Sequence, residues 1–100
     1  MVQIKFTHSA RTDLKEVLEH FKSEGVEGRG EETVADLIHA MELVLDNPKM
    51  GRVVPEFQVD SLRELIRPPY RVVYRITDEW ITVVRVWRSE RLMKPILDQP

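Results

Sequence analysis

The segment Tyr70-Arg71-Val72-Val73-Tyr74-Arg75-Ile76 decides the fold, together with Val83-Val84-Arg85-Val86-Trp87-Arg88-Ser89-Glu90-Arg91. Both segments are predicted to be buried β-strands, because β-branched and aromatic residues dominate them. Arginines nevertheless interrupt both at near-regular intervals, and a guanidinium group is costly to bury unpaired. These arginines either pair with acidic residues of the same protein or form a cationic surface directed at a polyanion or an acidic protein. The function depends on which alternative holds.

The charge distribution favours the C-terminal half as the functional surface. Residues 1–50 carry six basic and ten acidic side chains, whereas residues 51–100 carry nine basic and seven acidic ones. Eight of the ten arginines lie between Arg52 and Arg91. Arginine suits planar, bidentate contacts with phosphate or carboxylate better than lysine does. The overall net charge of -2 gives no general case for nucleic-acid binding.

The composition excludes several classes of protein. One hundred residues with 42% hydrophobic residues predict one globular domain over residues 1–100. The absence of cysteine excludes disulfides, thiolate chemistry and cysteine-based zinc sites, and we expect neither a metal nor a cofactor. The sequence shows no long apolar run and no signal-peptide pattern, so we expect a soluble cytoplasmic protein without a membrane partner.

The N-terminal half is predicted to form one strand and two helices. Residues 2–6 alternate apolar and polar, which favours a strand, and Thr7 or Ser9 could cap the helix that follows. Apolar stripes then recur at helical spacing over residues 14–21 and 34–45. Thr33 and Asp36 have capping-box spacing, and an earlier helix start is also compatible with the sequence. A short connection between the helices predicts an antiparallel hairpin.

The C-terminal half is predicted to contain three strands. Residues 51–57 are expected to form an ordered loop, and residues 62–66, 70–76 and 80–87 to form strands. Pro68-Pro69 must lie in a turn or at a strand edge. Residues 89–97 could form a short helix. The predicted class is α+β in the order β-α-α-β-β-β, with an antiparallel helical hairpin packed on an antiparallel sheet.

Four motifs in this order resemble the RelE/ParE superfamily of toxins from bacterial type II toxin–antitoxin modules. They are Asp13-Leu14 near the start of the first helix, the stretch from Asn47-Pro48 through Gly51-Arg52-Val53-Val54-Pro55-Glu56, Arg63-Glu64-Leu65 before the Tyr70–Ile76 strand, and the last strand leading into Arg88-Ser89-Glu90-Arg91. The resemblance spans nearly the whole chain. It implies the RelE/ParE fold and a cognate antitoxin. It also implies that the toxin contacts operator DNA only through this antitoxin.

The superfamily has two functional branches, and the resemblance implies different site residues for each branch. RelE-like members resemble ribosome-dependent endoribonucleases, for which the matching residues here are Arg71, Arg88, Arg91 and Glu56. ParE-like members keep the fold and poison DNA gyrase. Here no tyrosine follows Tyr74 and no histidine follows His39, so the usual C-terminal acid of the nucleases is missing. An arginine is a poor proton shuttle, which favours the ParE-like branch.

The target surface of a ParE-like toxin would consist of the remaining arginines of the C-terminal half. These candidate target-binding residues are Arg52, Arg63, Arg67, Arg75 and Arg85. The alternative is that such arginines pair across the sheet with Glu64, Asp78, Glu79 or a helix carboxylate. A third possibility is a non-toxic binding module that only keeps the fold.

One small sheet cannot cover the apolar stripes of two helices completely, so we expect apolar surface for a partner. The candidate antitoxin-binding residues are Leu14, Leu18, Phe21, Leu37 and Met41. An extended, partly disordered antitoxin segment is expected to fold over the helical hairpin and the edge of the sheet.

Overall fold

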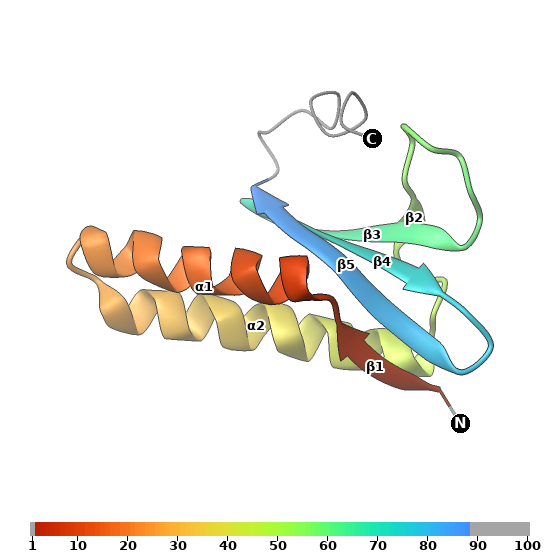
Figure 1. The fold of residues 1–100 in the computed structure, drawn as a ribbon, viewed down its shortest axis with the longest axis horizontal. Helices are drawn as coiled ribbons and strands as arrows, with labels where there is room; N and C mark the ends of the chain where they lie inside the picture. The colour runs from red at the N-terminus through yellow and green to blue at the C-terminus, as the bar shows by residue number, and fades with distance from the viewer. Residues whose placement is uncertain (1, 89–100) are drawn as a thin grey trace.

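Two helices pack side by side against one face of a five-stranded sheet in the computed structural model (Figure 1), which describes residues 2–88. This arrangement confirms the predicted α+β class and the predicted order of elements, with one additional short strand. The elements are β1 (Gln3–Phe6), α1 (His8–Ser23), α2 (Glu27–Asp46), β2 (Arg52–Val53), β3 (Leu62–Arg67), β4 (Tyr70–Ile76) and β5 (Trp80–Arg88). The possible helix over residues 89–97 lies outside the described residues.

The strands lie in the order β1-β5-β4-β3-β2, and their neighbours are antiparallel except at one edge. β1 runs parallel to β5, with Gln3 opposite Trp80 and Phe6 opposite Val83. The prediction of an antiparallel sheet is therefore corrected at this strand. Tight hairpin turns enforce antiparallel pairing, whereas β1 reaches the sheet only through the helical pair, so no turn fixes its direction.

The structure confirms a predicted N-terminal cap for α1 but not the one predicted for α2. The Thr7 side chain accepts a hydrogen bond from the Ala10 N–H at 3.0 Å, which confirms it as the cap of α1. α2 begins at Glu27, which confirms the earlier helix start and rules out a capping box at Thr33 and Asp36. Gly25, at a φ of +78°, ends α1 with a turn that only glycine adopts readily, so the chain enters α2 at once.

The main core lies between the helices and the sheet. We call the helix-packed side of the sheet the covered face and the other side the open face. The core residues of the covered face come from α1, α2, β3, β4 and β5: Ala10, Val17, Leu37, Ala40, Met41, Val44, Leu65, Tyr70, Val72, Tyr74, Ile81, Val83 and Val86. A smaller apolar cluster covers part of the open face and consists of Val54, Leu62, Val73 and Trp87.

A β-bulge interrupts the pairing of β4 with β5. Val73 lies opposite Arg85 while Tyr74 lies opposite Val83, so Val84 is the extra residue on β5. β1 ends beside Val83, which leaves the outer edge of residues 84–88 without a strand partner among the described residues. The bulge shifts the alternation of β5 by one residue, so each later side chain of this strand changes face.

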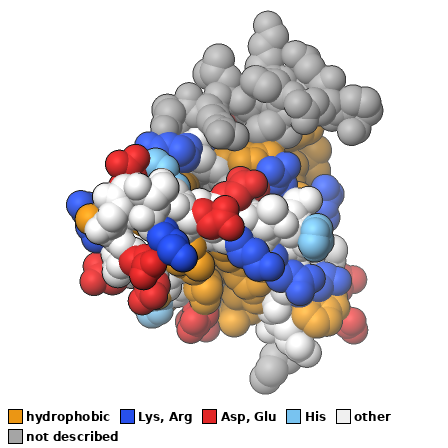
Figure 2. Space-filling model, turned by 60° about the vertical axis from the view of Figure 1, so that its left-hand side comes forward, with side chains coloured by type: hydrophobic (Ala, Val, Ile, Leu, Met, Phe, Trp, Pro, Cys, Tyr) orange, Lys and Arg blue, Asp and Glu red, His pale blue; other side chains and the backbone are white. Residues whose placement is uncertain are grey.

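Charged side chains of both signs are interspersed on the face drawn in Figure 2, with hydrophobic side chains visible between them. That face carries no large surface of a single sign. Within residues 2–88, neither helix has the length and apolar character of a membrane span, and no cluster of histidine and carboxylate side chains could hold a metal ion.

Tyr74 joins the sheet to the loop before β2, which leads to a testable expectation. Its hydroxyl donates to the Pro48 carbonyl oxygen at 2.8 Å and accepts from the Gly51 N–H at 2.9 Å. Tyr74→Phe should cost about 1–3 kcal/mol in the free energy of unfolding, because the buried N–H loses its acceptor. The measurement is urea unfolding at pH 7, with Tyr70→Phe on the same strand as the control.

The pH dependence of this stability has a definite sign. Burial raises the pKa of the Tyr74 hydroxyl above the ordinary value for tyrosine. Above pH 10 the unfolded chain releases this proton while the folded chain retains it, so the wild-type protein loses stability as the pH rises. Tyr74→Phe lacks this loss, and its deficit should therefore shrink above pH 10. A deficit that stays constant or grows there would contradict this assignment.

Candidate functional site

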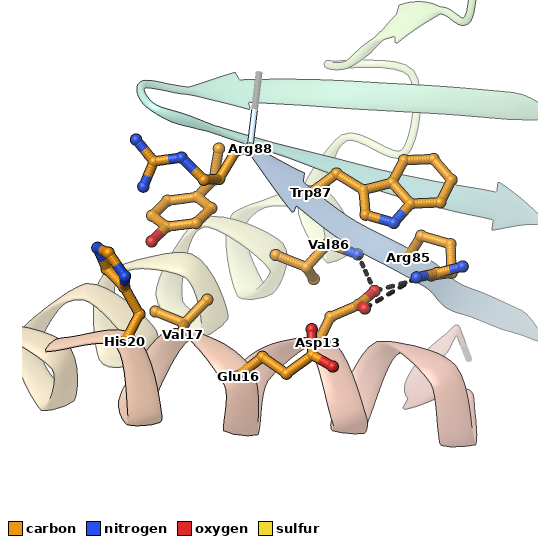
Figure 3. Close-up of a pocket in the computed structure, with 9 residues that line it drawn as sticks. Asp13, Glu16, Val17, His20, Arg85, Val86, Trp87 and Arg88 are labelled. Atoms are coloured by element: carbon orange, nitrogen blue, oxygen red, sulfur yellow. Dashed lines mark hydrogen bonds and ion pairs between the residues drawn. The ribbon is translucent and has the colours of Figure 1, made fainter. Parts of the chain in front are cut away.

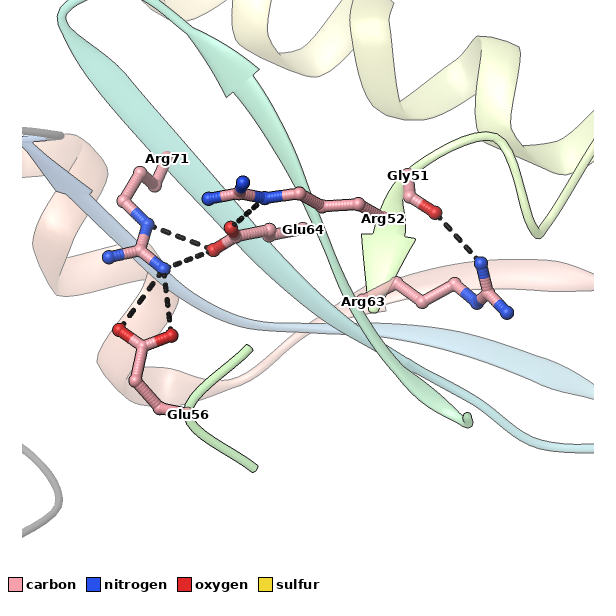
Figure 4. A network of polar contacts seen from close by, with 6 residues as sticks. All are labelled: Gly51, Arg52, Glu56, Arg63, Glu64 and Arg71. Carbon is pink, nitrogen blue, oxygen red and sulfur yellow. Dashed lines mark hydrogen bonds and ion pairs between the residues drawn. The ribbon is translucent and has the colours of Figure 1, made fainter. Parts of the chain in front are cut away.

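Two arginines and two glutamates meet on the open face and form the open-face charge cluster: Arg52, Glu56, Glu64 and Arg71 (Figure 4). Glu64 lies on β3 with its side chain fully buried. Its carboxylate accepts from Arg52 Nε at 2.6 Å and from Arg71 Nε at 2.9 Å, and it also pairs with Arg71 Nη2. Glu56 lies on the turn between β2 and β3, with its carboxylate oxygens 3.4 and 3.5 Å from Arg71 Nη2.

The cluster accounts for the burial of Arg71, whose side chain is 9% exposed. Burial alone would lower the pKa of this guanidinium, but the hydrogen bonds and charges of Glu64, and then of Glu56, raise it above its usual value. Arg71 is therefore a permanent cation held by carboxylates of its own chain.

Arg63 holds the loop before β2 in place. Its Nη2 pairs with Asp60 at 2.7 Å, and its Nη1 donates to the Gly51 carbonyl oxygen at 2.9 Å. The backbone approaches closely at this point, since a Cβ on Gly51 would lie 2.6 Å from both the Glu64 carbonyl oxygen and the Tyr74 hydroxyl. Only glycine fits beside these two atoms, which gives a physical reason for the Gly-Arg pair of the second motif.

Asp13 of α1 reaches the edge of β5 that β1 leaves without a strand partner among the described residues (Figure 3). Its carboxylate accepts from Arg85 Nε at 2.8 Å, from Arg85 Nη2 at 2.9 Å and from the Val86 N–H at 2.9 Å. This bidentate pair raises the pKa of the Arg85 guanidinium, against the opposing effect of its partial burial. The first and the last of the four sequence motifs thus meet in space.

Arg88 lies on the covered face, beside a hollow between α1 and the end of β5. It lies opposite Tyr70 across the strands, with its guanidinium carbon 5.8 Å from the centre of the Tyr70 ring. Figure 3 shows it near His20. Arg71 lies opposite Trp87 and faces the open side. Because Arg71 and Arg88 lie on opposite faces of the sheet, the structure does not bring them together. Arg91 lies outside the described residues.

The expectation that the arginines face outward as an unpaired cationic surface is wrong for four of them. Arg52, Arg63, Arg71 and Arg85 form ion pairs with carboxylates of the same chain. Arg67 and Arg75 are exposed and form no ion pair with a carboxylate of residues 2–88, but Arg67 lies opposite Tyr70 and Arg75 opposite Leu62, on different faces. The alternative was that the arginines pair with carboxylates of the same protein, including a carboxylate on a helix. Most of these arginines follow this alternative.

The candidate antitoxin-binding residues differ in their accessibility. Leu37 and Met41 are 3% and 1% exposed, so neither presents a surface to a partner, and the prediction is corrected for both. Leu14 and Phe21 are partly buried against the core, and Leu18 lines a shallow hollow with charged residues of both helices. On α2, the apolar side chains of Ile38 and Leu43 are 38% and 42% exposed. Ile38 lies on the α2 stripe, whereas Leu43 lies outside it, and helical spacing alone did not show that Ile38 remains exposed.

Solved structures share this fold. The toxin–antitoxin system described as chromosomal ParDE from P. aeruginosa superposes with a TM-score of 0.74 at 23% identity, covering 90% of this chain and 98% of that one. The RelBE2 toxin–antitoxin complex of Mycobacterium tuberculosis gives 0.64 at 21% identity, covering 87% and 96%. The E. coli DinJ-YafQ complex gives 0.61 at 15%, covering 88% and 93%. A comparison with curated proteins gave no match.

The fold is therefore that of the RelE/ParE toxins. The sequence model described as the ParE toxin of the type II toxin–antitoxin system parDE matches residues 4–93. The chain belongs to this family and is a ParE-like member of the RelE/ParE superfamily.

Proposed function

We propose that this toxin acts by binding and inhibiting DNA gyrase, and that a cognate antitoxin neutralises it. The match of the ParE family model to residues 4–93 is the observation that carries this proposal. An inhibitor of this kind needs a complementary surface and no catalytic residues of its own. The antitoxin would pack on the exposed apolar residues of α2, and operator DNA would be contacted only through the antitoxin.

The geometry supports an inhibitor over a nuclease. Metal-free RNA cleavage needs a proton donor and acceptor next to the cation that stabilises the phosphorane. The chain has only two tyrosines, and both face the covered side of the sheet, while its three histidines all lie on the helices. Neither residue type is therefore available beside Arg71, and Arg88 lies on the other face.

One observation favours the second candidate, ribosome-dependent mRNA cleavage. Glu56 and Arg71 lie in contact on the open face, so a carboxylate base and a cation are adjacent there. The same contact neutralises both groups, which weakens this candidate. Ribosome-dependent mRNA cleavage nevertheless predicts a different outcome when the toxin is induced.

Induction of the chain in growing cells distinguishes the candidates. Gyrase inhibition should give filamentation and DNA-damage signalling, and the purified toxin should abolish supercoiling of relaxed plasmid by gyrase. Co-expression of the neighbouring antitoxin gene should restore growth. Translation arrest with mRNA cut inside codons, at undiminished supercoiling activity, would replace this proposal by the nuclease. Unimpaired growth at high expression would leave only a non-toxic binding module.

A further inference from the structure

The turn between β2 and β3 forms a separate exposed unit on the open face. It starts at Val54, which is fully buried, and returns to the sheet at Leu62, which is 7% exposed. Residues 55–60 are all exposed. The Val54 N–H donates to the Leu62 carbonyl oxygen at 3.1 Å, so the base of the turn is closed independently of its tip. Displacement of the tip would therefore leave this hydrogen bond at its base in place.

Glu56 is the replaceable member of the open-face charge cluster. Glu64 is fixed in β3 and fully buried, whereas the Glu56 side chain is 25% exposed and contacts Arg71 only at 3.4 and 3.5 Å. These distances exceed those of an ordinary charge-assisted hydrogen bond. Two arginines and two glutamates balance in the cluster, so removal of Glu56 leaves one excess positive charge that faces the open side and attracts an anion.

An apolar hollow adjoins the cluster. Phe57 and Val59 of the turn form one wall, and Leu62, Val73 and Trp87 of the sheet are among the other residues that line it. Trp87 lies directly opposite Arg71 across the strands, so the hollow and the cation are neighbours. The volume of the hollow is about 280 Å³. A cavity of about 150 Å³ holds a benzene ring, so this hollow can receive an aromatic side chain.

We propose that the open face binds a partner polypeptide in which an acidic residue is followed by a large apolar residue. The incoming carboxylate would replace Glu56 on Arg71, and the apolar side chain would enter the hollow as Phe57 moves aside. The toxin's own Glu56-Phe57 pair holds the site until such a segment arrives. The inference concerns this site and does not depend on which cellular target the toxin inhibits.

The surroundings favour a polypeptide over a nucleic acid. Nucleic-acid binding requires several cations that follow the phosphate backbone. On the open face, Arg52 and Arg71 share Glu64, and Arg75 is the cation at the rim without a carboxylate partner among the described residues. The one excess charge that displacement of Glu56 leaves in the cluster, with Arg75 alone beside it at the rim, is too few cations to follow a phosphate backbone and matches a carboxylate next to an apolar side chain.

A peptide with the toxin's own turn sequence tests the proposal. The probe is the acetylated and amidated peptide Val-Pro-Glu-Phe-Gln-Val-Asp, which reproduces residues 54–60. Titrated into the full-length chain, it should bind the Glu56→Gln variant about tenfold more tightly than wild type, because the internal competitor has lost its charge. Asp78→Asn, which removes an exposed carboxylate outside the turn, is the matched control and should bind as wild type does.

Two further arms make the test decisive. The peptide with glutamine in place of its glutamate should lose the gain, and Phe57→Ser, which leaves Glu56 in place, should also bind the original peptide more tightly than wild type. Equal affinities for Glu56→Gln and Asp78→Asn, or equal binding of the glutamine peptide, would overturn the proposal. It would also be overturned if a single-stranded oligouridylate bound Glu56→Gln more tightly than the peptide does.

Discussion

Glu64→Gln should destabilise the protein by about 3–5 kcal/mol, because it leaves the buried Arg71 guanidinium without its principal counter-charge. The Glu64 side chain is fully buried and contacts both Arg52 and Arg71. Only the longer contact with the Glu56 carboxylate, at 3.4 Å, would remain for Arg71. For a chain of this size, the midpoint of thermal unfolding should fall by roughly 15 °C or more. Urea and thermal unfolding of the purified variant measure both quantities.

Two comparison variants separate the buried pair from the exposed one. The Arg52 side chain is 60% exposed, so Arg52→Ala should cost no more than about 1 kcal/mol. Combining Glu64→Leu with Arg71→Met replaces both buried charges by apolar groups of similar size and should recover most of the stability. If Glu64→Gln is as stable as Arg52→Ala, Arg71 does not depend on Glu64 and the described role of the cluster is wrong.

Most elements of the fold, though not β2, could be predicted from the sequence because they depend on local patterns. β-branched and aromatic content predicts the strand over Tyr70–Ile76, helical spacing predicts the stripes of the two helices, and Thr7 is one of the two caps that the sequence offers for α1. The direction of β1 could not be predicted, since pairing between residues 77 positions apart is set by the assembled sheet.

The separation of Arg71 from Arg88, two residues of the candidate nuclease site, has one identifiable cause. Strict alternation from Ile81 along β5 would place Arg88 on the open face, together with Arg71. The extra residue at Val84 shifts this alternation, and Arg88 therefore lies on the covered face beside Tyr70. A bulge of this kind leaves no clear pattern in one sequence, so the separation of the two arginines required the structure.

The motif residues also acquire roles that spacing alone did not give. Glu64 is one of several carboxylates that the sequence offers as partners, and in the structure it holds two of the arginines. The pairing of arginines with carboxylates was an open alternative at the level of sequence, because one-dimensional spacing does not determine which side chains meet across a sheet. The four motifs thus describe a network of ion pairs that fixes the loop before β2 and the edge of β5.

Asp13→Ala should cost about 2–4 kcal/mol in the free energy of unfolding, since it removes both partners of the Arg85 fork and the acceptor of the buried Val86 N–H. Asp13→Asn should cost less, because an amide oxygen can still accept from Val86 while the charge is lost. Lys15→Ala, at an exposed position of the same helix, should stay within about 0.5 kcal/mol of wild type.

Hydrogen exchange locates the effect of Asp13 within the fold. The Val86 amide lies on the edge of β5 beyond the end of β1, so its protection depends on Asp13 and on the packing of α1. Asp13→Ala should accelerate exchange at Val86 well before it affects Val72 in the centre of the sheet, because local opening of an edge precedes global unfolding. Equal acceleration at both amides would show that Asp13 contributes only to global stability. If neither exchange rate changes, Asp13 does not hold the edge of β5. The contact between the first and last motifs then contributes nothing to stability.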